Sequence, residues 1–378
     1  MQTPSRSARC LRYRQQVLPD GPAAIAQLPG TRGFGPLHTA LFQAVRTIDA
    51  GNVFVVGPGA AATALWAHRA GAAVTTWQDS IAEDLAIEAT FQLNHCTVPT
   101  RYVQWDPAVL SPGWAELALL HLPRGRALQA HLLQLAGAML APSGRLIFVG
   151  ATKEGVKGAI ANATQLFGAA GVVARKGGYH AAVAYRPASS IPLPAITFSS
   201  RKIEVDGQVT RLISCRGVFA HNRLDSGAAA LIAGMRVEPG SRGLDMGCGT
   251  GLVGLAALRR GARVIGTDVS ARAVTSARRT WNANGFPESS VKLCVGANAV
   301  SAGTMEFVIA NPPFHRGHDV HLEVAQLFIR EAARVLQTGG ELYLVANAFL
   351  DYRPWLAEHF RIVSIAREDR RFRVWHAC

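Results

Sequence analysis

The sequence predicts an α/β protein with two tandem domains, each a mainly parallel, doubly wound sheet, the C-terminal one ending in an antiparallel hairpin. Three observations support this prediction. Short apolar strands alternate with segments of helical spacing along most of the 378 residues. A glycine-rich turn follows a strand in each half. A segment with three prolines, residues 186–194, separates the halves and places a domain boundary at residue 190.

The first domain, residues 1–190, is expected to open with helix and loop over residues 17–50, where turn residues interrupt an alanine-containing stretch. Strands and helices then alternate. We expect strands at 52–56, 73–77, 117–122 and 145–150, and helices from 60 to about 70, at 81–93 and at 126–140.

The second domain, residues 191–378, is expected to begin with a strand pair over 198–212 that turns at Asp206-Gly207. Asp225 then precedes a helix at 228–235. Further strands are expected at 244–246, 264–268, 291–295, 305–310 and 341–346, with an amphipathic helix at 322–336 and a short helix near Trp355. A closing strand pair at 360–366 and 371–375 adds an antiparallel hairpin to an otherwise parallel sheet.

The chain is strongly basic, with 39 Lys plus Arg against 25 Asp plus Glu and a formal charge of +14. Both halves share the excess, at 16 basic to 9 acidic residues up to position 190 and 23 to 16 after it. This balance favours a polyanionic partner, for which nucleic acid is the usual candidate. The alternative is an arginine-rich proteome, because only five of the 39 are Lys.

The six cysteines show no paired spacing and no cluster with histidine, so we expect neither a disulfide framework nor a metal site. No run approaches the ~18 apolar residues that cross a bilayer, so no membrane partner is expected. Residues 3–16 are basic and contain serines, which suits a frayed tail better than a transit peptide. We expect a reduced, soluble, cytoplasmic protein.

The halves match as copies of one fold, because the same spacing relates Gly57 to Gly247 and Gly59 to Gly249. Their chemistry differs. Opposite Asp245 the first half has Phe54 or Val55, opposite Asp268 it has Gln78, and opposite 311–314 it has His-Leu-Pro-Arg at 121–124. A sheet survives such changes, whereas a ligand site that needs those side chains does not. We expect a degenerate first domain that docks RNA or the ribosome, with purely structural support as the alternative.

The glycine-rich turn after the strand at 244–246 predicts a nucleotide-type cofactor site. Gly247, Gly249 and Gly251 allow a ligand to approach the backbone closely, and the N-terminus of the next helix offers free N–H groups. This spacing also fits the dinucleotide site of a dehydrogenase. Asp245 favours a different cofactor, because its carboxylate would repel a pyrophosphate and attract the cationic amino group of S-adenosylmethionine through backbone or water.

Two polar residues at later strand ends extend this cofactor site. Asp268 ends the strand at 264–268, where its carboxylate is placed to accept hydrogen bonds from both ribose hydroxyls. The alternative role for Asp268 is the N-cap of the helix that begins at Ser270-Ala271. Asn298 follows the third strand and is placed to bond the adenine edge, with a plain turn residue as the alternative.

The tetrapeptide Asn311-Pro312-Pro313-Phe314 follows an apolar strand and predicts a pocket for the amine of a nucleobase. Such an amine is a poor nucleophile because its lone pair is delocalised into the ring. The Asn311 side-chain carbonyl and the Pro312 backbone carbonyl would accept its N–H groups and localise the lone pair towards a sulfonium methyl group. The prolines keep both acceptors aimed, and Phe314 offers a ring on which the base stacks. A proline turn that merely ends a strand is the structural alternative.

A base within a duplex cannot reach such a pocket, so the target is single-stranded, looped or flipped. His315 and Arg316 come next in the sequence and are candidates for contact with phosphate or base edges, with a solvated loop as the alternative. Together these motifs predict methyl transfer from S-adenosylmethionine to a base.

These residues resemble a known family, the bacterial ribosomal RNA guanine-N2 methyltransferases that act on 16S and 23S rRNA. The resemblance rests on residues 217–219, 224–227, 244–251, 311–315 and 345–350. It implies a degenerate N-terminal and an active C-terminal methyltransferase-like domain. The implied cofactor site lies near Asp225, Asp245, Gly247, Asp268 and Asn298, and guanine is implied at 311–314. The implied partner is ribosomal RNA or an assembling ribosomal subunit, with 16S favoured over 23S.

Other functions are compatible with parts of this pattern. An Asn-Pro-Pro-aromatic turn also serves adenine-N6 methylation of DNA and glutamine methylation of release factors. The basic charge disfavours the protein substrate, and the duplicated domain disfavours both. A non-catalytic RNA-binding or ribosome-assembly factor would not need Asp245, Asp268 and Asn311 together.

Overall fold

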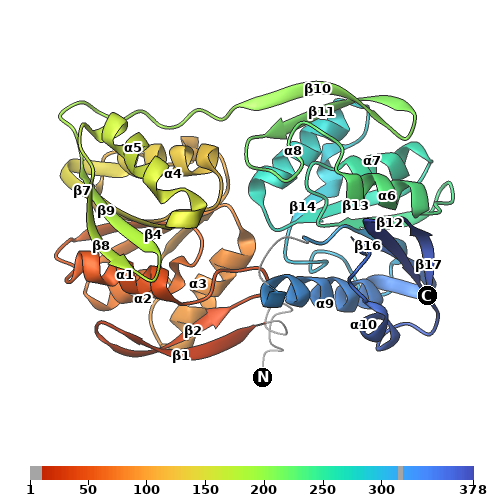
Figure 1. Cartoon of the computed structure of the whole chain (residues 1–378), viewed down its shortest axis with the longest axis horizontal. Coiled ribbons are helices and arrows are strands. Elements are labelled where there is room, and N and C mark those ends of the chain that lie inside the picture. The colour runs from red at the N-terminus through yellow and green to blue at the C-terminus, as the bar shows by residue number, and fades with distance from the viewer. Residues whose placement is uncertain (1–10, 314–317) are drawn as a thin grey trace. The chain divides into compact units, whose positions relative to one another are not determined.

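A computed structural model of the chain describes residues 11–313 and 318–378 (Figure 1). They form two compact units, Leu11–Ile196 and Thr197–Cys378, which we call the N-unit and the C-unit. The proline-containing segment 186–194 packs on the N-unit. Ile191 is buried in that unit's core and Leu193 packs against it.

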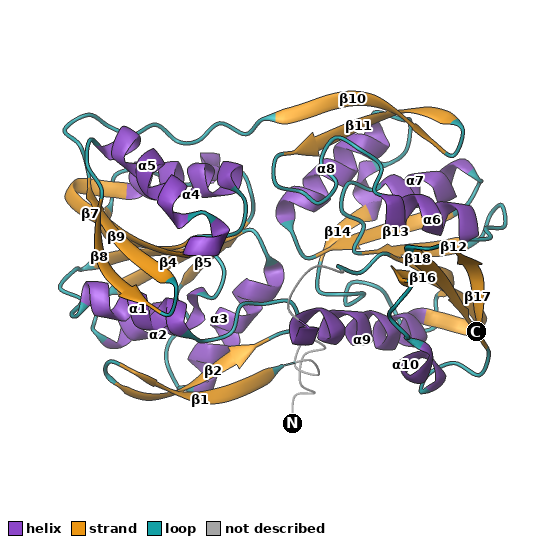
Figure 2. Cartoon of the chain, viewed as in Figure 1, coloured by secondary structure: helices purple, strands orange, loops and turns teal. Residues whose placement is uncertain are grey.

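The N-unit contains a seven-stranded sheet and a separate two-stranded hairpin (Figure 2). The hairpin strands are β1 (Arg12–Leu18) and β2 (Gly21–Gln27). The sheet strands are β3 (Asn52–Val56), β4 (Ala73–Gln78), β5 (Thr100–Val103), β6 (Ala115–His121), β7 (Leu140–Ala151), β8 (Gly171–Lys176) and β9 (Tyr179–Tyr185). The helices are α1 (Pro36–Val45), α2 (Ala60–Arg69), α3 (Ile81–Leu93), η2 (Pro107–Val109), α4 (Arg126–Met139), η3 (Thr152–Glu154) and α5 (Val156–Phe167).

The β1–β2 hairpin corrects the expectation of helix and loop over residues 17–50, which is wrong for residues 17–27. Leu18 pairs with Gly21 across a two-residue turn. Strand β2 is hard to predict from sequence because its alanines at 23, 24 and 26 suit a helix. Its four consecutive buried positions also lack the two-residue alternation of a half-buried strand. Its backbone is satisfied from a distant helix, since Ala26 N–H donates to Thr90 Oγ1 at 3.0 Å and Ala24 N–H to Asn94 Oδ1 at 3.1 Å.

The C-unit repeats this architecture (Figure 2). A separate hairpin pairs β10 (Phe198–Val205) with β11 (Gln208–Cys215), as the sequence predicts. The sheet strands are β12 (Arg242–Met246), β13 (Arg263–Asp268), β14 (Val291–Leu293), β15 (Met305–Ala310), β16 (Leu336–Asn347), β17 (Val363–Glu368) and β18 (Phe372–Ala377). The helices are α6 (Ser226–Gly234), α7 (Leu252–Arg259), α8 (Ala271–Asn282), η4 (Glu288–Ser290), α9 (His318–Val335) and α10 (Arg353–Ala357).

The two sheets share one strand order and one residue register. The order is β5-β4-β3-β6-β7-β9-β8 in the N-unit and β14-β13-β12-β15-β16-β18-β17 in the C-unit. Asp245 pairs with Gly266 and Ile309, and Val55 pairs with Thr76 and Leu119 at the same spacing. Val55, rather than Phe54, is therefore the counterpart of Asp245. The predicted fold class is confirmed, and the N-unit sheet also ends in an antiparallel hairpin, β8–β9, which the sequence analysis did not anticipate.

Each sheet is covered on both faces. In the N-unit, Val53 and Val55 pack with α1, α2 and α3, whereas Phe54 and Val56 point to the opposite face and pack with α4 and α5. In the C-unit, α6, α7 and α8 form one core with the sheet, and α9 contacts β15 and β16. Because the first five strands of each sheet are parallel, their carboxyl ends meet at one edge. In such folds ligands bind at that edge.

Gly57 lies in close contact with the backbone of His121 at the carboxyl edge of the N-unit sheet. Its φ is +100°, and a Cβ placed on it would lie 2.0 Å from the carbonyl oxygen of His121. Gly57→Ala is therefore expected to lower the free energy of unfolding by more than about 3 kcal/mol, combining a left-handed backbone with a clash against main chain. Gly71→Ala is the matched control, because its φ is +91° but nothing lies within 4 Å, so only about 1–2 kcal/mol is expected. Urea unfolding measures both, and equal losses would contradict the proposed close approach.

Candidate active site

The predicted motifs meet where two neighbouring strands of the C-unit end. Met246 and Ala310 are paired residues of the parallel strands β12 and β15. Gly247 and Asn311 are the next residues of the two strands, so the glycine turn and the Asn-Pro-Pro turn leave the sheet side by side. From β12 the chain adds β13 and then β14 on one side of the strand. It then crosses over and adds β15 on the other side of β12. This reversal is the topological switch point at which such sheets bind ligands.

The glycine turn is shaped by three left-handed residues and one tryptophan. Gly247, Gly249 and Gly251 have φ of +73°, +55° and +80°. Trp281 Nε1 donates to the Gly251 carbonyl at 2.8 Å, and a Cβ on Gly251 would lie 2.6 Å from that nitrogen. A Cβ on Gly249 would meet nothing within 4 Å, so this backbone is open to a ligand. Sequence analysis missed Trp281, whose burial on α8 gives no sign of its contact with a turn 30 residues away.

Asp268 supports the glycine turn directly. One carboxylate oxygen accepts the Gly249 N–H at 2.9 Å, and the other accepts the Ser270 N–H at 2.9 Å. The alternative of Asp268 as an N-cap is wrong, because Ser270 is the N-cap of α8 and its side chain accepts the Ala273 N–H. Asp268 is half-buried, and a carboxylate oxygen can accept more than one hydrogen bond. The residue can therefore hold the turn and also accept ribose hydroxyls.

Asp245 lies beneath the turn, with 3% of its surface exposed. Its Oδ2 accepts the Gly254 N–H of α7 at 2.8 Å. Burial raises the pKa of this carboxyl to about 7, the Gly254 N–H opposes the shift, and the nearby charge of Asp268 adds to it. A cationic group close by would stabilise the ionised form of such a buried carboxyl. The attraction for an amino group stays a prediction.

This pKa predicts a pH dependence that Asp245→Asn removes. The folded pKa of about 7 exceeds the ordinary value of 3.8, so the folded protein holds a proton that the unfolded chain releases between those values. The free energy of unfolding of the wild type therefore falls as pH rises from about 4 to about 7. As pH rises through that window, the free energy of unfolding of Asp245→Asn should increase by about 1–4 kcal/mol relative to that of the wild type. Urea unfolding at pH 5 and pH 8 measures this, and a pH-independent difference would contradict it.

Asn311 is oriented by a residue far away in the sequence. Its Nδ2 lies 3.5 Å from Oδ2 of Asp225, at the long end of the hydrogen-bond range. Asp225 is the N-cap of α6 and also accepts the N–H groups of Gly227 and Ala228. Because a carboxylate only accepts, the amide must turn its NH2 group towards Asp225, which leaves Oδ1 as the acceptor for a ligand. A Cβ on Gly227 would lie 3.4 Å from this Oδ1, so glycine keeps space beside it.

The other predicted site residues are placed less fully. Pro312 is buried and Pro313 exposed directly after Asn311. Asn298 is half-buried after β14, and its backbone N–H donates to Val295 O at 3.1 Å. Phe314, His315 and Arg316 lie outside the described residues. Among residues 11–313 and 318–378, no group of three or more His, Cys, Asp or Glu is arranged to hold a metal ion, and no helix has the length and apolarity to span a bilayer.

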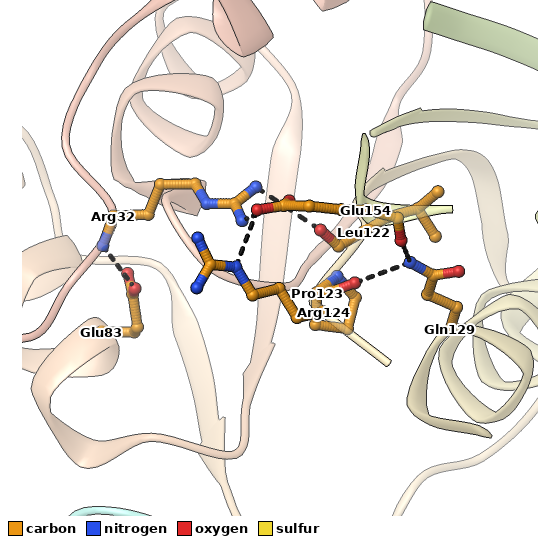
Figure 3. Close-up of polar contacts among 7 residues, drawn as sticks. All are labelled: Arg32, Glu83, Leu122, Pro123, Arg124, Gln129 and Glu154. Carbon is orange, nitrogen blue, oxygen red and sulfur yellow. Dashed lines mark hydrogen bonds and ion pairs between the residues drawn. The ribbon is translucent and has the colours of Figure 1, made fainter. Parts of the chain in front are cut away.

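The same edge of the N-unit is built from different side chains (Figure 3). Its counterparts of Asp245, Asp268 and Asn311 are Val55, Gln78 and His121, by strand register and spacing. Buried Glu83, from α3, accepts the N–H groups of Gly59 and Arg32, both at 2.9 Å. A Cβ on Gly59 would lie 3.3 Å from Arg32, whose guanidinium reaches the Leu122 carbonyl at 3.5 Å.

Arg32 therefore covers the N-unit glycine turn where the C-unit turn is open. Leu122 is the counterpart of Pro312, so the arginine N–H contacts the carbonyl position that is predicted to accept a base amine in the C-unit. Arg32 fills the space at the N-unit turn, and Val55 and Gln78 replace the carboxylates of Asp245 and Asp268. Both differences argue against a second cofactor site in the N-unit.

Comparisons with known proteins agree with this geometry. The family model described as the methyltransferase small domain matches residues 209–376. The glycine turn, the acidic strand end and the Asn-Pro-Pro corner on this sheet define the chain as a methyltransferase that uses S-adenosylmethionine. Residues of the site fit that cofactor, since Gly249 is open and Asp268 is half-buried beside it.

Curated relatives identify the family. The ribosomal RNA small subunit methyltransferase C of Alcanivorax borkumensis is 31% identical over 306 residues, covering 79% of this chain and 91% of the relative. The protein of the same name from Pseudomonas fluorescens is 34% identical over 311 residues, covering 80% and 88%. The chain belongs to the ribosomal RNA small subunit methyltransferase C family.

A solved structure matches both units. It is the T. thermophilus 16S rRNA N2 G1207 methyltransferase in complex with AdoMet and guanosine, 26% identical to this chain. The TM-score is 0.82, and the match covers 97% of each chain.

Proposed function

We propose that this chain methylates the exocyclic N2 amine of a guanine in 16S ribosomal RNA, with S-adenosylmethionine as methyl donor. The observation that carries the proposal is the Asn311 corner at the end of β15, beside the glycine turn at the end of β12. The solved relative bound to AdoMet and guanosine is described as a 16S rRNA N2 methyltransferase, which supports the same target for this site.

We assign the cofactor to the turn at Gly247, Gly249 and Gly251. Asp268 accepts the ribose hydroxyls, Asn298 bonds the adenine edge, and Asp245 favours the amino group through the turn. When bound, the cofactor supplies an electrophilic methyl group on a positively charged sulfur. The open backbone at Gly249 supports this placement, since a ligand can approach it without displacing side chains.

The substrate amine lies at the proline-braced corner. Asn311 Oδ1 and the Pro312 carbonyl accept its two N–H groups, which turns its lone pair towards the methyl group. Asp225 remains a candidate cofactor-binding residue, and it also orients Asn311, because its carboxylate lies 3.5 Å from the Nδ2 of that amide. Pro313 holds the turn, Phe314 stacks on the base, and His315 and Arg316 contact the neighbouring nucleotides.

We assign residues 191–378 as the catalytic domain and residues 1–190 as a degenerate domain that serves substrate docking. The partner is ribosomal RNA, free or in an assembling small subunit, and the setting is the cytoplasm. The arrangement of Arg32 over Gly59 supports the degenerate assignment.

Mapping of ribosomal RNA tests this function. Nucleoside mass spectrometry of 16S rRNA fragments from cells with and without the protein should show loss of one N2-methylguanosine in the deletion strain. Expression of the wild-type chain should restore it, and Asn311→Ala should not. An unchanged set of N2-methylguanosines in 16S rRNA would contradict the proposed function.

A further inference from the structure

Three of the chain's five lysines lie at one edge of the N-unit sheet. Lys153 is in η3, Lys157 is in the first turn of α5, and Lys176 ends β8. All three are exposed. Thr152 connects η3 to the β8–β9 turn, because its N–H and its hydroxyl both donate to the Gly178 carbonyl, at 2.9 and 3.0 Å. The lysines therefore belong to one connected surface.

Two arginines extend this surface from the end of β6. Arg124 lies three residues after the end of β6, and Arg126 begins α4. Gln129 Nε2 donates to the carbonyls of Pro123 and Glu154, both at 2.8 Å, and so joins this loop to η3 (Figure 3). The Arg124 side chain is 61% exposed. We call Arg124, Arg126, Lys153, Lys157 and Lys176 the basic edge.

The carboxylate of Glu154 contacts this edge and is already neutralised. Glu154 bonds Arg124 Nε at 2.8 Å and Arg32 Nη2 at 3.2 Å (Figure 3). Burial raises the pKa of Glu154, but the Arg124 hydrogen bond and the Arg32 charge outweigh it, and the pKa is lowered overall. The carboxylate therefore stays ionised and paired. The first turns of α4 and α5 contain no acidic residue, so their dipoles add to the positive potential.

Comparison with the C-unit shows how this edge differs from a base-binding edge. β7 and β16 have the same length, so Lys153 is the counterpart of Phe349, which is 79% exposed. By the spacing of the repeat, Arg124 is the counterpart of Phe314. Two aromatic positions of the catalytic unit are cations in the N-unit. Aromatic rings stack on bases, whereas Lys and Arg pair with phosphate.

We propose that the basic edge binds the phosphate backbone of the RNA substrate. Its positive groups are exposed, they come from four segments of one sheet edge, and their charge complements a polyanion. The contact is independent of base sequence, because it reads charge and not base edges. The proposal rests on the proposed function in naming RNA as the partner, and it adds a second contact to the catalytic corner.

The test uses the full-length chain and a fluorescein-labelled fragment of 16S rRNA. Lys153→Gln, Lys157→Gln and Lys176→Gln are combined in one variant, which spares the Arg124–Glu154–Arg32 network. The matched control combines Lys202→Gln, Lys292→Gln and Arg14→Gln, which removes the same charge at exposed positions elsewhere. Fluorescence anisotropy measures RNA affinity at several salt concentrations. The melting temperature of each variant checks that folding is intact.

The expected result is a selective loss of electrostatic binding. Each lost phosphate contact lowers the magnitude of the slope of log K against log salt by about 0.7 on single-stranded RNA. Loss of three lysine contacts should therefore lower the magnitude of this slope by about 2 in the basic-edge variant. The control should lose much less. An unchanged slope in the basic-edge variant, or an equal loss in the control, would overturn the proposal. Failure of the proposed function shows separately, as RNA binding by the wild type without methyl transfer.

Discussion

Replacing Asn311 by alanine is expected to lower kcat for methyl transfer about 10²–10³-fold and to leave S-adenosylmethionine affinity unchanged. The loss follows because, in the proposed mechanism, Oδ1 is one of two acceptors that polarise the amine, and removing one preorganised group of an active site costs about this much. The proposed cofactor residues lie at the neighbouring strand ends, which the substitution does not touch. Single-turnover transfer to 16S rRNA at saturating cofactor measures the rate, and calorimetry measures the affinity.

Asn282→Ala is the matched control for this change, because Asn282 is exposed at the end of α8. It should keep the wild-type rate. Asp225→Asn offers a finer test, since an amide at 225 no longer dictates which end of the Asn311 amide faces it, and we expect a smaller loss of rate, about tenfold. Full activity in Asn311→Ala would contradict the assigned role of the corner.

Replacing Asp268 by alanine is expected to weaken S-adenosylmethionine binding about 100-fold or more. Hydrogen bonds to a charged group contribute about 1.5–3 kcal/mol each, and two ribose hydroxyls would be lost as partners. The variant also loses the acceptors of the Gly249 and Ser270 N–H groups, so the glycine turn loosens. Calorimetry with the purified protein measures the dissociation constant.

Two further variants separate binding from folding. Asp268→Asn keeps an acceptor at the same place and should lose about tenfold in affinity. Asp206→Ala removes an exposed carboxylate of the same unit, paired with Arg260, and should bind the cofactor normally. Wild-type affinity in Asp268→Ala would show that the cofactor does not use this strand end.

Much of the parallel core was predictable from sequence because its strands are short apolar runs bounded by turn residues. The strands at 52–56 and 305–310 have the predicted bounds. The N-terminal hairpin was missed because Ala23–Ala26 are all buried and the backbone of β2 bonds to Thr90 of α3 and to Asn94, the C-cap of that helix. No local pattern encodes a partner that lies so far along the chain.

The site shows the same division. The glycines, Asp268 and Asn311 could be predicted to lie together because each ends or directly follows a strand, and strand ends of a parallel sheet converge. The contact between Asn311 and Asp225 joins residues 86 positions apart, and the contact of Trp281 with Gly251 joins residues 30 apart. These contacts decide orientation and turn shape, and only tertiary packing creates them. The exchange of Phe349 for Lys153 likewise becomes visible once strand register fixes the counterparts.

The product of methyl transfer tests the central claim most directly. Purified protein, unmodified 16S rRNA and S-adenosylmethionine labelled in its methyl group are incubated together, and the RNA is digested to nucleosides for chromatography. If the Asn311 corner polarises the guanine N2 amine, the label appears in N2-methylguanosine. Label in a ring-nitrogen methylguanosine, in a methyladenosine, or in no nucleoside would contradict the account.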